Sequence, residues 1–128
     1  MTAQSFDPSA AELVSVDVSL VGPGAVVTAA GEIDSTSAPV LRERLDSLLD
    51  GEVAEVTVDL TGVTFLDSAG LCVLAAAHRR AAGQDVAFRV LASSRAVIRP
   101  LQITGLWNLL RAEQVPAGTV ERQGVGAA

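Results

Sequence analysis

The sequence has 128 residues, 49% of them apolar, with 15 acidic and 9 basic side chains and a net charge of −6. This length fits a single domain, and the negative charge argues against direct binding to the phosphate backbone of nucleic acid. Every basic residue is Arg, so the absence of Lys excludes a GxxxxGK[ST] phosphate-binding loop and a Schiff-base enzyme.

The N-terminal half opens with a predicted β-hairpin. Residues 1–12 show no periodicity and are expected to form a flexible tail. Apolar and polar residues then alternate from 13 to 20, as in a half-buried strand, and Gly22-Pro23-Gly24 predicts a turn. Residues 25–31 are expected to form a second strand, antiparallel to the first.

A helix, a strand and a loop are predicted next. Capping residues and a proline at 34–39 indicate the start of a helix that ends by Gly51. Residues 53–60 are rich in β-branched side chains and predict an interior strand. Residues 61–67 are expected to form a loop.

The following run is almost wholly apolar and predicts a largely buried second helix. Asp67 or Ser68 is expected to cap it, and Gly83 stands at its end. Cys72 lies inside this run and is interpreted as a small core residue. Residues 86–91 predict a fourth strand.

The last predicted elements complete a single α/β domain. Ser93-Ser94 are expected to cap a third helix, which Pro100 should bend or shorten. Trp107 is expected to pack in the core. The order β-β-α-β-α-β-α predicts a mixed sheet with helices packed on it over residues 13–111, and residues 112–128 are expected to form a flexible tail.

Ser68 is the strongest candidate for a functional residue. It stands where a loop meets the start of a buried helix, without a bulky neighbour after it. A helix N-terminus carries free N–H groups and partial positive charge, so it tolerates a phosphoryl group. Such a group would add about −1.5 to −2 charge beside Asp67. The alternative is that Ser68 is only the N-cap of its helix.

Catalysis by Ser68 is not expected. Its surroundings lack the first glycine of the GxSxG nucleophile elbow. The one histidine of the chain, His78, lies ten residues further along the same predicted helix, which is about 15 Å away. We interpret His78 as a solvated residue next to two arginines.

No cofactor, metal or membrane segment is predicted. Cys72 and His78 are too few ligands for an ordinary zinc site. Asp34, Asp59 and Asp67 would be candidates for a Mg²⁺ cluster, but capping and turn roles explain each of them equally well. The chain contains no signal-peptide pattern and no apolar run of the ~20 residues that span a bilayer, which predicts a cytoplasmic protein.

One segment carries a family resemblance. The string VDLTGVTFLDSAGL at 58–71 is preceded by GEID at 31–34 and followed by 94–106 with its Thr-Gly-Leu ending. From Leu13 to Leu110 the chain resembles a STAS domain of the anti-sigma factor antagonist type. Two departures are Cys72, where the family often has a smaller residue, and the absence of an amphipathic helix pattern after residue 111.

The resemblance implies a non-enzymatic switch. In such proteins the unmodified antagonist binds an anti-sigma factor, which is itself a serine kinase of the histidine-kinase-like ATPase fold, and thereby releases the sigma factor. Phosphorylation by that kinase ends the interaction, and a PP2C-type phosphatase restores it. The phosphorylated serine of the family corresponds to Ser68. The partner surface is expected to include Asp34, Asp67, Ser68 and Gly70, and the small size of Gly70 lets the helix start close to the loop.

Two alternatives stay open from the sequence. The chain could be a STAS subunit of a larger assembly, either a stressosome-like complex or a lipid-transport machinery, without phosphorylation of its serine. It could also be a small enzyme or nucleotide-binding protein that uses Ser68 and nearby Asp residues. Co-purification of a kinase-fold protein would favour the antagonist, and co-purification of transporter subunits would favour the assembly subunit.

Overall fold

The computed structural model describes residues 14–116 as a five-stranded sheet with four helices in that range. In chain order the elements are β2 (Val14–Val21), β3 (Gly24–Ile33), α2 (Ala38–Asp50), β4 (Glu55–Leu66), α3 (Ser68–Gly83), β5 (Ala87–Ala92), α4 (Arg95–Ile103), α5 (Leu106–Leu109) and β6 (Ala112–Gln114). The predicted tail at 1–12 lies outside the described residues. The α/β class and the mixed sheet are confirmed.

The strands follow one another across the sheet in the order β2-β3-β4-β5-β6. β2 and β3 pair antiparallel, whereas the later neighbours pair parallel. The predicted turn between β2 and β3 is confirmed, and Gly22 has a φ of +58°, a region in which glycine is unstrained.

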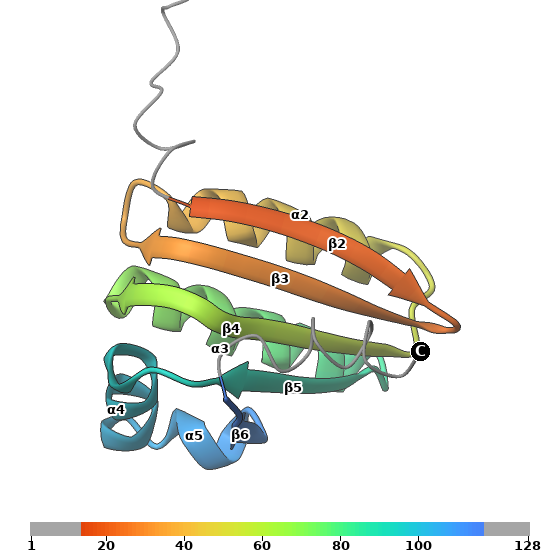
Figure 1. The fold of residues 1–128 in the computed structure, drawn as a ribbon. Coiled ribbons are helices and arrows are strands. Elements are labelled where there is room, and N and C mark those ends of the chain that lie inside the picture. The colour runs from red at the N-terminus through yellow and green to blue at the C-terminus, as the bar shows by residue number, and fades with distance from the viewer. Residues whose placement is uncertain (1–13, 117–128) are drawn as a thin grey trace, which may run out of the picture.

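Two helices cover one face of the sheet. Figure 1 shows α2 and α3 side by side behind the strands. Leu41, Leu45 and Leu49 recur at helical spacing along α2 and are buried. In β2, Val14 and Val16 are buried while Ser15 and Asp17 are exposed, so alternation directs one set of side chains toward the helices.

The predicted loop at 61–67 is wrong for most of its length, because β4 continues to Leu66. Val63 and Leu66 are buried there, and β3 pairs with this stretch through two register shifts. At the second shift Gly31 has a φ of +103°, which lets β3 bend and remain hydrogen-bonded to β4. The sheet therefore extends further toward Ser68 than the sequence predicts.

Two predictions for α3 are also wrong. Cys72 is exposed, because α3 lies on one face of the sheet and buries a single stripe of its surface. His78 is half-buried rather than solvated, and its ring meets Phe88 edge-on with centroids 6.1 Å apart. Residues 68–77 of α3 carry no charged side chain, so the sequence of this stretch could not show which side faces the core.

Ser93 and Ser94 connect α4 to the end of β4 instead of capping α4 through their side chains. The Ser93 hydroxyl donates to the carbonyl of Thr61 at 3.0 Å, and that of Ser94 to the carbonyl of Val63 at 3.1 Å. Ser94 occupies the N-cap position, but its side chain makes no capping bond. Pro100 lies inside α4, and the helix ends three residues later.

The chain past residue 110 contributes one more strand. Trp107 is half-buried and packs against the core, as predicted. β6 pairs parallel with β5, so 112–114 belong to the sheet and not to the predicted tail. The rest of that predicted tail, from residue 117, lies outside the described residues. Within the described range, every helix is too short or too polar to cross a membrane.

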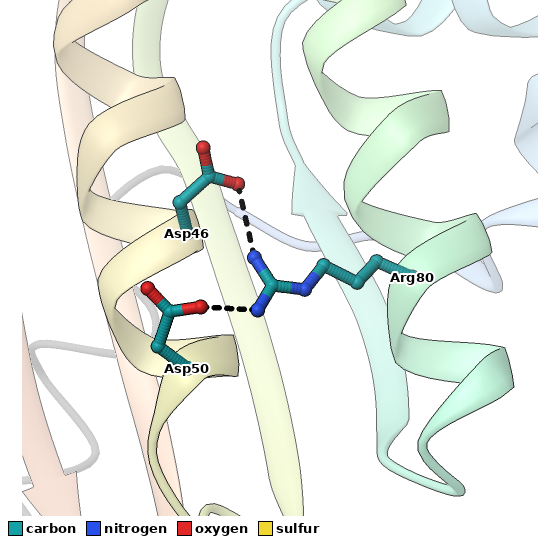
Figure 2. A network of polar contacts seen from close by, with 3 residues as sticks. All are labelled: Asp46, Asp50 and Arg80. Atoms are coloured by element: carbon teal, nitrogen blue, oxygen red, sulfur yellow. Dashed lines mark hydrogen bonds and ion pairs between the residues drawn. The ribbon is translucent and has the colours of Figure 1, made fainter.

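An arginine joins the C-terminal ends of α2 and α3. Figure 2 shows the Arg80 guanidinium reaching across to two carboxylates of α2. Nη1 lies 3.5 Å from Oδ1 of Asp46, and Nη2 donates to Oδ1 of Asp50. The hydrogen bond with Asp50 raises the pKa of Arg80 above its ordinary value. This ion-pair cluster lies at the end of the helix pair remote from Ser68.

Candidate functional site

Pairing of β3 with β4 brings the first two predicted site residues together. Ile33 and Leu66 are register partners at the carboxyl ends of these parallel strands. Adjacent strands lie about 4.8 Å apart, so Asp34 and Asp67, each the next residue, leave the sheet side by side. The backbone N–H of Asp67 still donates to the carbonyl of Ile33 at 3.2 Å.

Asp67, not Ser68, caps α3. Its Oδ1 accepts hydrogen bonds from the backbone N–H of Ala69 at 2.9 Å and of Gly70 at 3.4 Å. These are donors of the first helical turn, which have no partner within the helix. The alternative that Ser68 serves only as the N-cap is therefore excluded.

Ser68 is consequently free to act as an acceptor of a chemical group. It is the first residue of α3 and is exposed. Among residues 14–116 its hydroxyl is assigned no hydrogen bond, whereas Asp67 beside it is committed to the cap. The N-terminal end of a helix carries about half a positive charge, which favours an anion there. The arrangement can accommodate a phosphoryl group without loss of the helix cap.

Asp34 organises the turn between β3 and α2. Its Oδ1 accepts from the backbone N–H of Thr36 at 2.9 Å and of Ser37 at 3.1 Å. The buried Ser37 hydroxyl also donates to the carbonyl of Glu32 at 2.7 Å, which fixes the turn to the sheet. Donation from the Ser37 backbone is the main reason that the pKa of Asp34 lies below its ordinary 3.8. Asp34 therefore presents a negative charge at neutral pH.

Gly70 is buried, which differs from its predicted place on the partner surface. A Cβ at this position would lie 2.3 Å from Cδ1 of Leu66 and 2.9 Å from Cγ2 of Ile33. Glycine is thus required for the close approach of α3 to the ends of β3 and β4. This agrees with the other role expected of Gly70, that of letting the helix start close to the preceding segment.

The three candidate Mg²⁺ ligands are Asp34, Asp59 and Asp67. In the structure they have turn and capping roles, which were the alternative to metal binding. Asp59 is buried within β4, and its Oδ1 accepts from the backbone N–H of Thr61 at 2.9 Å. Asp34 and Asp67 each hold a local turn or cap, as described above. Within residues 14–116 no group of three or more His, Cys, Asp or Glu side chains is placed to hold a metal ion.

Two features next to Ser68 were missed from the sequence. One is a shallow groove of about 370 Å³ between the N-terminal parts of α2 and α3, lined in part by Pro39, Arg42 and Cys72. The other is Phe65 near the end of β4, whose side chain is 46% exposed. The groove depends on the packing of two helices, which the sequence does not show, and Phe65 lies in a segment that the sequence predicts to be a loop.

Comparisons with known proteins find similar sequences over most of the chain. The family described as "Mlab, STAS domain" matches residues 16–111. The anti-sigma-F factor antagonist RsfB of Mycobacterium tuberculosis (strain H37Rv) is 35% identical over 103 residues, which are 80% of this chain and 84% of that protein. The anti-sigma-B factor antagonist of Bacillus subtilis (strain 168) is 33% identical over 108 residues, or 84% of this chain and 98% of that protein.

A solved structure shares both the fold and part of the sequence. The crystal structure of an anti-sigma factor antagonist from Mycobacterium paratuberculosis superimposes with a TM-score of 0.73 and 31% identity. The match covers 77% of this chain and 84% of that protein. The similarity therefore extends over most of the residues that form the sheet and the site.

Proposed function

This chain belongs to the STAS domain family, and on that basis we propose that it is an anti-sigma factor antagonist switched by phosphorylation of Ser68. The unphosphorylated protein binds an anti-sigma factor, a serine kinase of the histidine-kinase-like ATPase fold, and releases the sigma factor. Phosphorylation by that kinase ends the complex, and a PP2C-type phosphatase restores it. The protein itself is a cytoplasmic binding module and not an enzyme.

The exposed hydroxyl of Ser68 is the observation that supports this proposal most strongly. A kinase can reach it, because Ser68 is exposed at the end of the sheet. The group added there does not disturb α3, because the cap is supplied by Asp67. The positive end of the helix partly compensates the charge of a phosphoryl group. The modification would thus change the surface while the fold stays intact.

The phosphoryl group weakens binding of the partner. It adds about −1.5 to −2 charge next to Asp67 and close to Asp34. A partner surface complementary to a neutral hydroxyl then faces a dianion that it must desolvate. Loss of about 3–4 kcal/mol of association free energy corresponds to several hundred-fold in Kd, which is sufficient for a switch.

Binding of Ser68 variants to a purified anti-sigma serine kinase from the same organism tests the proposal. We expect Ser68→Ala to bind like the wild type and to escape phosphorylation. Ser68→Asp should bind more weakly at unchanged helicity, because it places a charge at the same position. Ser19→Asp is the matched control, since Ser19 is exposed on β2 near the opposite end of the sheet. Equal affinity of Ser68→Asp and the wild type would contradict a charge switch.

Peptide mass spectrometry on protein from its native cells gives an independent test. We expect phosphate on Ser68 with an occupancy that changes between growth and stress. If the Ser68 peptide is detected without modification under every condition, the phosphorylation switch is wrong. Stable co-purification of assembly subunits would then support the alternative of a STAS subunit in a stressosome-like or lipid-transport complex.

A further inference from the structure

We propose that the side chain of Phe65 is an apolar anchor for the partner that binds at Ser68. The ring inserts into a pocket on the surface of that partner. This inference rests on the proposed function, because it assigns a contact to the same complex. It adds a recognition residue that does not take part in phosphorylation. The partner surface that fits it is an apolar pocket bordered by basic side chains.

The position of Phe65 on the sheet supports this role. Its register partner is Glu32 on β3, and the next pair, Ile33 and Leu66, is buried toward α3. Because side chains alternate along a strand, Phe65 and Glu32 are directed to the face opposite the helices. Phe65 is 46% exposed there, at the end of the sheet where α3 begins.

The exposure of Phe65 alone would not identify it as a binding residue, because single apolar residues are common on protein surfaces. The other aromatic rings of the described range are less exposed: Phe88 is buried, and Trp107 is half-buried against the core. Four large apolar side chains are more exposed than Phe65, but none of them belongs to the strand that ends next to Ser68: Leu20, Val21, Ile103 and Leu109. Proximity to the acceptor serine therefore distinguishes Phe65.

The size of protein interfaces allows a partner that contacts Ser68 to contact Phe65 as well. Ser68 is the third residue after Phe65, so their Cα atoms are at most about 11 Å apart. A standard interface buries about 800 Å² on each partner, which corresponds to a patch about 30 Å across. A patch of that size centred on the Ser68 hydroxyl is wide enough to reach Phe65 around the end of the sheet.

Charge around Phe65 indicates the chemistry of the partner pocket. Glu32 is exposed beside it, and Asp34 and Asp67 lie at the same strand ends. In protein interfaces, aromatic side chains are enriched at the apolar centre, and polar groups surround them at the rim. A few such central residues contribute most of the binding free energy. Basic side chains around the pocket would pair with these carboxylates while the ring is desolvated.

The test compares Phe65→Ala with wild type in binding and phosphorylation by the purified anti-sigma serine kinase. We expect the Kd to rise about tenfold or more, as for a residue at the centre of an interface. The KM for phosphorylation of Ser68 should rise with little change in kcat, because the ring binds the kinase without touching the transferred group. Phe65→Leu, which keeps most of the apolar contact, should recover most of the affinity.

Leu20→Ala is the matched control, since Leu20 is 72% exposed near the opposite end of the sheet. It should leave Kd and KM unchanged. Circular dichroism of each variant shows whether the fold is retained. If wild type binds and is phosphorylated but Phe65→Ala behaves identically, the anchor is wrong and the proposed function stands. If wild type neither binds nor is phosphorylated, the proposed function itself fails.

Discussion

Gly70 limits how closely α3 can approach the strands that carry the site. An alanine Cβ there would overlap the side chains of Leu66 and Ile33. We expect Gly70→Ala to lower the free energy of unfolding by about 1–3 kcal/mol, as overpacking does in closely packed cores. Urea denaturation followed by circular dichroism measures this change.

Gly83 provides the control for that substitution. It belongs to the same helix, and a Cβ at Gly83 would meet no atom within 4 Å. Gly83→Ala should therefore be neutral or slightly stabilising, because alanine has the higher helix propensity. Equal changes in the free energy of unfolding for Gly70→Ala and Gly83→Ala would contradict a steric role for Gly70.

Individual residues show how far the sequence could predict the site. Ser68 and Asp67 were identified because a polar pair between a strand and an apolar helix is a local pattern. The sequence does not predict the burial of Cys72 and His78 correctly, because the only charged residues of α3 are Arg79 and Arg80 and burial depends on which side of the helix meets the sheet. Phe65 could not be recognised as exposed until its register with β3 was known.

At the scale of elements, capping of α3 separates the roles of two adjacent residues. Asp67 accepts the hydrogen bonds of the first turn, whereas Ser68 does not. We expect Asp67→Ala to lower the free energy of unfolding by about 1 kcal/mol, the usual cost of removing an N-cap. Ser68→Ala should leave stability nearly unchanged, and Asp67→Asn should retain most of it, because asparagine also caps. Thermal unfolding of the three variants tests this, and a larger loss for Ser68→Ala would reverse the assignment.

Element boundaries were harder to predict than element order. The order up to α4 follows from periodicity and turn residues, and the structure confirms it. The end of β4 was predicted too early, because Thr61 and Gly62 resemble a turn locally. Pairing with β3 keeps them in the strand, with Gly31 absorbing the register shift, and such long-range pairing has no local signal.

At the scale of the whole molecule, the proposed switch and one stabilising ion-pair cluster lie at opposite ends of the α2–α3 pair. The N-terminal ends of the two helices border the groove next to Ser68. Their C-terminal ends are joined by Arg80, Asp46 and Asp50 (Figure 2). The partner can therefore bind at the N-terminal ends of α2 and α3 without contacting the ion-pair cluster that joins their C-terminal ends.

This separation predicts that Arg80→Ala lowers the thermal unfolding temperature without changing partner affinity. The loss should be smaller at high salt, because these side chains are partly exposed and salt screens their attraction. Arg79→Ala is the matched control, since the neighbouring Arg79 is exposed and, within residues 14–116, has no assigned ion pair. Unfolding scans at low and high salt, together with Kd for the anti-sigma kinase, measure both quantities. A rise in Kd for Arg80→Ala comparable to that for Ser68→Asp would mean that the interface extends along the whole helix pair, and the two ends would not be independent.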